Sequence, residues 1–437
     1  MSGTLASLRE YVGGLALIDT HEHIVPESEW LAVPQDLFSW FPHYASSDLV
    51  SAGMPIPVLE EVRNPQLPLE QRWRQFAPYW QAARNTAYCR ALLIAARDLH
   101  GVEDINADTW RELSDKIAAS RRPGWYRHVL REKAGIEVSL NDTDYIARER
   151  SDWGLFAPVR RMDDVVSVRS RAELRQLERD YGLAVHSLGD LERLIGLIVE
   201  RAVAQGYVAL KNAIAYRRPI NFDIVTRHEA EQLFNRLPNY LDELRAKVYP
   251  GVALGWQEAK PLQDYLVHQF LRAAVDQHLP VQIHTGLQEG DGNILAHSNP
   301  LLLVNLFCEY PEVKFDLFHA GYPWTSEMAT LGKNFANVYL DMCWVHVISP
   351  AVGRRVLDEW LETVPGNKIL AFGGDYRFPE GAYAHAVMAR EVVAKVLAAK
   401  VEEGYFSESE AKAMAKRLLH DNADELFKLA ERKKVGL

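Results

Sequence analysis

The sequence predicts an α/β protein, a TIM-type (β/α)8 barrel with a helical insertion after its first strand. From about residue 151 onwards, short apolar runs alternate with helical segments, which is typical of a parallel α/β array. Almost every apolar run ends in a residue that can bind metal or move a proton, and barrels of this class collect such residues at their strand ends. No glycine-rich phosphate loop follows any run, which argues against a doubly wound open sheet.

The first expected strand is the apolar run over residues 14–18, which is followed by Asp-Thr-His-Glu-His at 19–23. A continuous apolar run of this length is typical of a strand that is buried on both faces. Side chains two residues apart on a strand point to the same side, so His21 and His23 can reach one cation.

A helical insertion is expected from residue 27 to about residue 150, where the chain is rich in Trp and Arg and has helical periodicity. Within it, Asn106 or Asp108 could cap a helix that runs on to residue 120. We expect the insertion to belong to a single domain over residues 1–437, because no low-complexity linker interrupts the chain.

The later strands are expected at 207–211, 280–284, 313–319, 337–341 and 368–375, with helices at 229–248, 262–277, 299–310 and 349–364 between them. Each of these strands ends in a side chain that can bind metal or move a proton. In chain order these are Lys211, His284, His319, Asp341 and Asp375.

The composition excludes several functional classes. A net charge of -10 argues against a nucleic-acid groove or an anionic membrane as the main partner. The three cysteines, Cys89, Cys308 and Cys343, are too few for a disulfide framework or a thiolate zinc cluster. With no export signal and no apolar run of membrane-spanning length, the sequence predicts a cytoplasmic protein.

The residue types at the strand ends predict a metal centre. His21 and His23 offer neutral nitrogens and Asp375 an anionic oxygen, a set that suits zinc or a similar transition ion. Such an ion makes hydroxide available near neutral pH. We expect Asp375 to act as the base that accepts the proton of the attacking water, and His319 or a second metal to stabilise the developing oxyanion.

The ordered set His21, His23, Lys211, His284, His319 and Asp375 resembles the amidohydrolase superfamily. Residues 200–400 are similar to the amidohydrolase-type domain of nodulin-like proteins that are fused to a glutamine synthetase-like domain. The segments ALKNAIAYR, FHAGYPWTSEMATL and GNKILAFGGDYRFPEGAY support this similarity. The long insertion after the first strand also resembles that of uronate isomerases of the same superfamily.

The resemblance implies one or two divalent metal ions. In the two-metal version His284 and His319 hold the second ion, and a carboxylated Lys211 bridges the pair. In the one-metal version His284 ligates and His319 hydrogen-bonds the substrate or the attacking water. Alternatively, these histidines could simply cap buried strands by bonding to the backbone.

The main functional prediction is a metal-dependent hydrolase that cleaves an amide or related C–N bond of a small, polar, carboxylate-bearing substrate. The alternatives are a uronate isomerase-like or non-oxidative decarboxylase activity with one metal, and a non-catalytic scaffold role, against which the intact ligand set argues. Tyr216, Arg217, Trp324 and Arg377 are the candidate substrate-binding residues, and His43 and Tyr44 could line the pocket. A homo-oligomer is expected.

Overall fold

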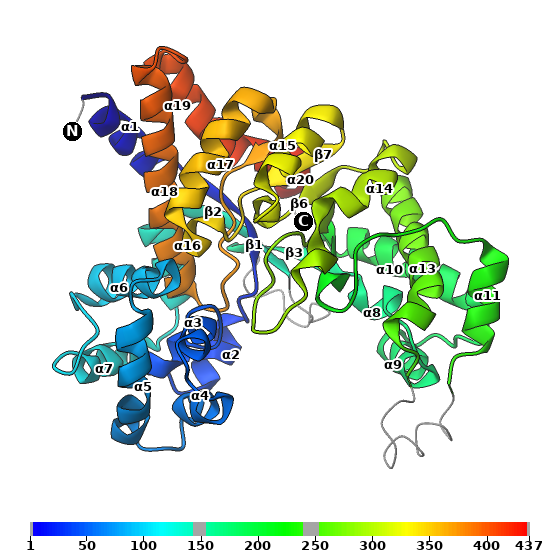
Figure 1. Ribbon diagram of the computed structural model, residues 1–437, viewed down its shortest axis with the longest axis horizontal. Coiled ribbons are helices and arrows are strands. Elements are labelled where there is room, and N and C mark those ends of the chain that lie inside the picture. The colour runs from blue at the N-terminus through cyan, green and yellow to red at the C-terminus, as the bar shows by residue number, and fades with distance from the viewer. Residues whose placement is uncertain (1–2, 143–153, 239–252, 435–437) are drawn as a thin grey trace. The chain divides into compact units, whose positions relative to one another are not determined.

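The computed structural model of the protein describes residues 3–142, 154–238 and 253–434. Eight parallel strands follow one another in sequence order, β1 to β8, in one sheet, and helices connect them (Figure 1). The predicted fold class, an α/β barrel of the (β/α)8 type with a helical insertion after the first strand, is confirmed.

Six of the eight strands coincide with expected ones, although the structure makes most of them shorter. The strands are β1 (Leu17–Glu22), β2 (Ile136–Asp142), β3 (Phe156–Arg161), β4 (Ala209–Asn212), β5 (Val281–Ile283), β6 (Phe315–Leu317), β7 (Val338–Asp341) and β8 (Ile369–Leu370). The sequence analysis missed β2 and β3. Because β2 begins at Ile136, the insertion ends there rather than near residue 150.

The chain divides into two compact units. The first, unit 1, contains residues 1–157, 288–293 and 340–425. In this unit β1 pairs with β2 and β7 with β8, both in parallel. The pairing of β1 with β2 is irregular between Asp19 and Glu22, where the first strand approaches its carboxyl end.

The insertion belongs to unit 1 and forms the group of helices labelled α2 to α7 in Figure 1. Its elements are α2 (Glu27–Ala32), η1 (Leu37–Trp40), α3 (Ala45–Ser51), α4 (Ile56–Arg63), α5 (Leu69–Ala83), α6 (Ala87–His100), α7 (Trp110–Ser120) and η2 (Arg127–Lys133). Neither Asn106 nor Asp108 caps α7, because Thr109 occupies the capping position and Asn106 instead accepts the N–H of Asp108 in a local turn.

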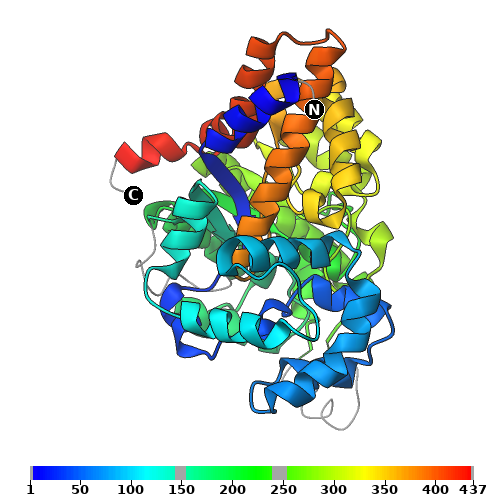
Figure 2. The same ribbon diagram turned by 90° about the vertical axis from the view of Figure 1, so that its left-hand side faces the viewer.

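Helices of the C-terminal region complete unit 1. They are α16 (Val345–Ile348), α17 (Pro350–Thr363), α18 (Pro379–Glu402), α19 (Glu408–Lys416), η8 (Arg417–Asp421) and α20 (Asn422–Phe427). The N-terminal helix α1 (Gly3–Gly14) lies alongside α18, as Figure 2 shows. Arg390 of α18 secures this packing by donating to backbone oxygens of Leu15 and Ala134 at 2.8 and 3.0 Å.

Unit 2 contains residues 158–287, 294–339 and 426–437. Its strands β3, β4, β5 and β6 pair in parallel, in that order. Its helical elements are α8 (Asp163–Val166), α9 (Arg171–Tyr181), α10 (Leu188–Ala204), η3 (Ile214–Tyr216), α11 (Arg227–Asn235), α13 (Trp256–Gln277), η4 (Leu295–Ser298), η5 (Pro300–Leu303), α14 (Val304–Glu309), η6 (His319–Gly321) and α15 (Thr325–Asn334). Part of the helix expected over 229–248 lies outside the described residues.

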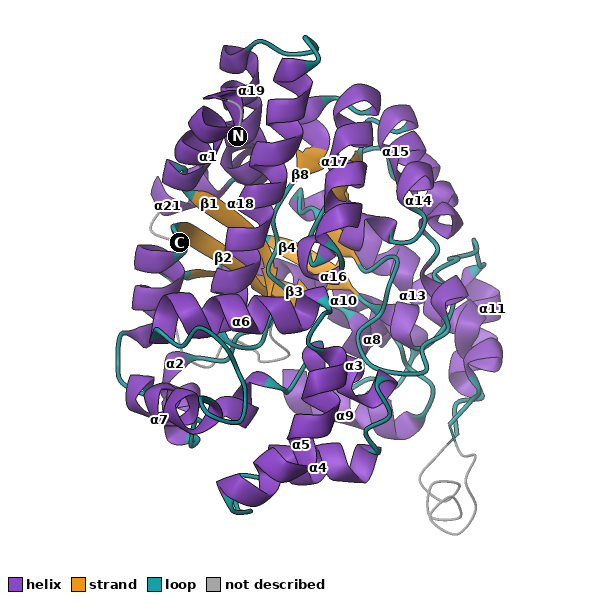
Figure 3. Ribbon diagram, turned by 60° about the vertical axis from the view of Figure 1, so that its left-hand side comes forward, coloured by secondary structure: helices purple, strands orange, loops and turns teal. Residues whose placement is uncertain are grey.

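Local sequence signals explain where several of these helices begin. Ser170, Ser187 and Thr226 each cap a helix, and an acidic residue three positions later closes a capping box. Figure 3 distinguishes the helices, in purple, from the short strands, in orange. Among the helices of the described residues, none has the length and apolar character needed to cross a bilayer.

Candidate metal centre

Three of the predicted ligands lie together in unit 1, at the carboxyl ends of β1 and β8. Nε2 of His21 lies 3.2 Å from Nε2 of His23. Oδ1 of Asp375 lies 3.5 Å from Nε2 of His21 and 3.3 Å from Nε2 of His23. Two imidazoles at the carboxyl end of the first strand therefore meet the carboxylate that follows the last strand.

These distances fit a cation-binding site. In a tetrahedral zinc site with bonds of about 2.0–2.1 Å, the ligand atoms are about 3.4 Å apart. The three distances between the ligand atoms of His21, His23 and Asp375, which are 3.2, 3.3 and 3.5 Å, match that spacing. Two neutral nitrogens and one carboxylate oxygen also suit a borderline-soft divalent ion. The residues that are present thus fit one such ion.

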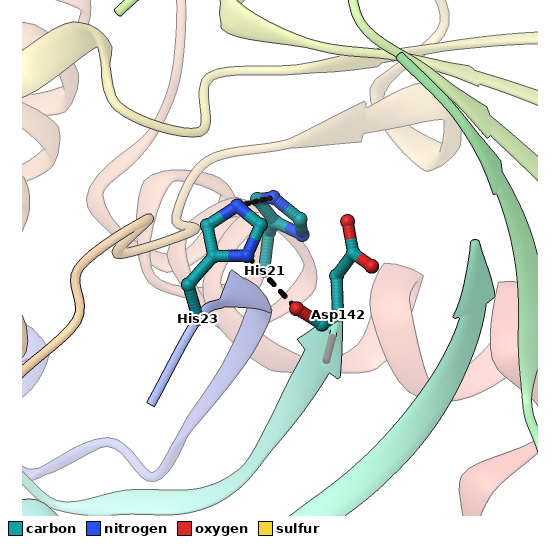
Figure 4. Close-up of side chains that lie close together, drawn as sticks. All are labelled: His21, His23 and Asp142. Carbon is teal, nitrogen blue, oxygen red and sulfur yellow. Dashed lines mark hydrogen bonds between the residues drawn. The ribbon is translucent and has the colours of Figure 1, made fainter. Parts of the chain in front are cut away.

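The strand β2 orients one of these ligands. Nδ1 of His23 donates to the backbone oxygen of Asp142 at 2.8 Å (Figure 4). This bond assigns the proton to Nδ1 and leaves the lone pair of Nε2 directed at the centre, as a second hydrogen bond does for most metal-binding histidines. A carboxylate oxygen of Asp142 also lies within 4.8 Å of ligand atoms of both histidines, so it is a further candidate ligand.

The backbone of Asp375 has an unusual conformation that the surrounding structure holds. Its φ of 58° lies in the left-handed region, which a non-glycine residue rarely adopts. The N–H of Asp375 donates to the backbone oxygen of His21 at 2.7 Å. The hydroxyl of Tyr44, from the insertion, donates to the backbone oxygen of Asp375. The insertion therefore contacts the residue that provides the carboxylate.

Aromatic rings surround Tyr44. Its ring stacks on those of Tyr88 and Trp344, with centroids 5.1 and 4.8 Å away, and meets the ring of Tyr376 edge-on at 5.1 Å. This packing, together with the charge of Asp375, raises the pKa of the Tyr44 hydroxyl well above its usual range. Tyr44 therefore remains a hydrogen-bond donor at neutral pH.

Two carboxyl groups of β1 are fully buried beside the centre. Burial raises the pKa of Asp19 to about 6, against the effect of its hydrogen bonds. Burial, and then the charge of Asp19, raise the pKa of Glu22 well above its usual range. Neither residue could be singled out from the sequence, because an acidic residue beside His-x-His gives no local sign of burial.

A second set of charged residues in unit 1 lies around His43. Nε2 of His43 is 4.0 Å from a carboxylate oxygen of Glu289. Burial lowers the pKa of His43 well below its usual range, and the positive charge of Arg377 lowers it further. His43 is therefore a neutral imidazole near the predicted substrate-binding residue Arg377, whose side chain is exposed.

The remaining predicted ligands lie together in unit 2. Nε2 of His284 donates to the backbone oxygen of Leu287 at 3.0 Å, and Nε2 of His319 donates to Nδ1 of His284 at 3.0 Å. Both nitrogens of His284 are thus engaged in hydrogen bonds, and burial lowers its pKa well below the usual range. Nζ of Lys211 lies 3.2 Å from the centre of the Phe318 ring.

The other predicted substrate-binding residues also belong to unit 2. The ring of Tyr216 contacts that of His284, with centroids 4.7 Å apart, and its side chain is partly exposed. Arg217 is exposed, and Trp324 is half-buried.

Cys343, which follows β7 in unit 1, was not predicted as a site residue. Its sulfur lies within 4.8 Å of a carboxylate oxygen of Asp375.

A family model described as amidohydrolase matches residues 178–429 of this chain. Protein fluG of Emericella nidulans is 32% identical over 246 residues, which are 55% of this chain but only 28% of fluG. The chain therefore spans less than a third of that relative.

Two further similarities extend over nearly the whole chain. A uronate isomerase of Rhizobium meliloti is 25% identical over 466 aligned residues, which cover 96% of this chain and 94% of the isomerase. The solved structure of uronate isomerase from Thermotoga maritima superposes with a TM-score of 0.78 at 17% identity and covers 98% of both chains. That likeness supports the fold.

Proposed function

This chain belongs to the amidohydrolase family, and from that premise we propose that it is a metal-dependent isomerase of sugar acids, of the uronate isomerase type. The observation that supports this proposal best is the similarity to a uronate isomerase over 96% of the chain, which includes the helical insertion. The match to fluG covers only 55% of the chain. For this reason we prefer isomerisation of a sugar acid to hydrolysis of an amide as the activity of this chain.

The arrangement of the histidines favours a single metal ion. His21, His23 and Asp375 would hold it. In this proposal His284 and His319, whose ring nitrogens lie 3.0 Å apart in unit 2, bind substrate or water rather than a second ion. When bound, a divalent ion would polarise the oxygens of the substrate.

The residues of the chain can perform the proton transfers of such a reaction. Conversion of an aldose into a ketose moves one hydrogen from C2 to C1 and one proton from O2 to O1, so it needs no co-reactant. The carboxylate of Asp375 is the base in unit 1, and the neutral imidazole of His43 can accept or return a proton. Arg377 has the charge and the planar geometry to bind the carboxylate of a sugar acid.

Product analysis tests this proposal. Full-length protein loaded with Zn²⁺ or Mn²⁺ is incubated with D-glucuronate, and the ketose product is followed by NMR. We expect turnover that requires metal and is lost in His21→Ala. Protein that binds one equivalent of metal but forms no ketose from a panel of hexuronates would contradict the isomerase assignment.

Amide hydrolysis is the second candidate, and the 32% identity to fluG together with the family match favours it. The same metal-loaded protein can be tested against N-acyl and γ-glutamyl amides. Release of amine from these compounds, with no ketose from hexuronates, would establish hydrolysis instead.

A further inference from the structure

Three successive backbone N–H groups around Asp375 donate to acceptors on one strand, β1. The N–H of Gly374 donates to Oδ1 of Asp19 at 2.9 Å. The N–H of Asp375 donates to the backbone oxygen of His21 at 2.7 Å. The N–H of Tyr376 donates to Oε2 of Glu22 at 2.6 Å. Two buried carboxyl groups thus secure the residues on either side of the last-strand ligand.

The carboxyl group of Asp19 is itself held by further hydrogen bonds. Asp19 accepts the hydroxyl of Ser139, on β2, at 2.9 Å and the N–H of His21 at 3.2 Å. Both side chains, Asp19 and Glu22, are fully buried. A buried group that accepts hydrogen bonds from a neighbouring backbone segment can hold that segment in a strained conformation. Without these bonds the segment would relax.

The residue before Asp375 is Gly374, which leaves room for the carboxyl groups of β1. A Cβ atom at this position would overlap with Oε1 of Glu22 and would also lie 3.4 Å from Oδ2 of Asp19. No side chain larger than hydrogen fits unless Glu22 moves. The glycine before Asp375 is therefore required by the carboxyl groups of β1.

We propose that Asp19 and Glu22 are a positioning pair, which holds Asp375 in its left-handed conformation and so fixes its carboxylate relative to His21 and His23. This inference rests on the proposed function, because the distances that it concerns are those of the metal centre. Without the pair, residues 374–376 lose two of their acceptors on β1, and Asp375 can relax towards ordinary backbone angles. Residues that orient metal ligands typically change metal affinity by about 10–100-fold when they are removed.

Cobalt titration of the full-length protein tests the positioning pair, because the visible absorption of bound Co²⁺ reports ligand geometry without any substrate. We expect Glu22→Ala and Gly374→Ala to bind Co²⁺ about 10–100-fold more weakly and with a changed spectrum. Glu22→Gln should bind within about threefold of wild type, because its amide still offers an oxygen to the N–H of Tyr376.

The matched control is Glu380→Ala, which removes another fully buried carboxyl group of unit 1, on α18, where Glu380 accepts the indole N–H of Trp125 at 2.7 Å. This control should keep the wild-type cobalt spectrum. An equal loss of affinity in Glu380→Ala would show a general effect of core damage and would overturn the inference.

The remaining outcomes separate the two proposals. Wild-type protein that binds no Co²⁺ would refute the metal centre, and with it the proposed function. Wild-type protein that binds Co²⁺, together with folded Glu22→Ala and Gly374→Ala variants of unchanged affinity and spectrum, would refute the positioning pair alone. If those variants do not fold, Glu22→Leu decides, because leucine fills a similar space but offers no acceptor to the N–H of Tyr376: wild-type affinity and spectrum in that variant would overturn the inference.

Discussion

Asp375 combines a strained backbone, a position 3.3–3.5 Å from two imidazole nitrogens, and a buried environment. We expect Asp375→Asn to fold and to keep much of its metal, but to lose turnover by about 10²–10⁴-fold, because an amide cannot accept a proton. Steady-state kinetics on metal-loaded enzyme measures this, with the exposed Asp291→Asn as control. Near-wild-type turnover in Asp375→Asn would show that another group is the base.

Tyr44 is the residue through which the insertion contacts the centre. In Tyr44→Phe the buried backbone oxygen of Asp375 loses a donor while the aromatic stack remains, so we expect a loss of about 1–3 kcal/mol in the free energy of unfolding. Urea denaturation measures this loss. Tyr88→Phe, which removes the hydroxyl of the neighbouring ring, should cost less. Equal losses in the two variants would mean that the bond from Tyr44 to Asp375 adds nothing specific.

At the scale of an element, the first turn of α18 buries Glu380 completely. Burial raises the pKa of its carboxyl to about 7, although Trp125 donates to it. The folded protein therefore binds a proton more tightly than the unfolded chain between about pH 4.5 and 7. Stability is lost as the pH rises through that window, and above it the folded protein contains an ionised carboxylate in a buried site.

Glu380→Gln should consequently be more stable than wild type at pH 8, by up to about 3 kcal/mol, and this gain should shrink towards pH 5. Glutamine keeps an oxygen for the indole N–H of Trp125. Urea midpoints at the two pH values measure the effect, with the exposed Glu312→Gln as control. A variant that is destabilised equally at both values would contradict the burial argument.

Elements differ in how well the sequence predicts them. The strands β1 and β4 to β8 could be predicted because each is a short apolar run that ends in a residue with distinctive chemistry. β2 and β3 were not predicted, since β2 directly follows a long helical block and β3 ends in an arginine, which is not a metal ligand. The insertion was predicted as helical, but its end was placed too late for the same reason.

Considered as a whole, the molecule buries several neutral histidines. Burial lowers the pKa of His346 and of His100 to about 4, and that of His385 to about 3. As neutral rings, His346 donates to the backbone oxygen of Ala371 at 2.8 Å and His385 to that of Gly374 at 2.9 Å. In the unfolded chain these groups have ordinary pKa values near 6.5.

Because the unfolded chain binds more protons below pH 6.5, stability should fall as the pH is lowered from about 6.5 to 4. Each histidine that stays neutral contributes a slope of up to about 1.4 kcal/mol per pH unit. His346→Gln, whose amide can still donate to Ala371, should reduce this slope, whereas the exposed His186→Gln should not. Urea midpoints between pH 7.5 and 4.5 measure it, and identical slopes in both variants would disprove the contribution of His346.

The sequence alone determined the fold class and the residue types of the metal centre, because hydrophobic periodicity and the residue at each strand end are local properties of the chain. Only the tertiary structure decided the tautomer of His23, the left-handed conformation of Asp375 and the burial of Asp19 and Glu22. Those features depend on hydrogen bonds between residues far apart in the chain, such as Glu22 and Tyr376, 354 positions apart. Such contacts exist only after the strands have assembled, so no local pattern can encode them.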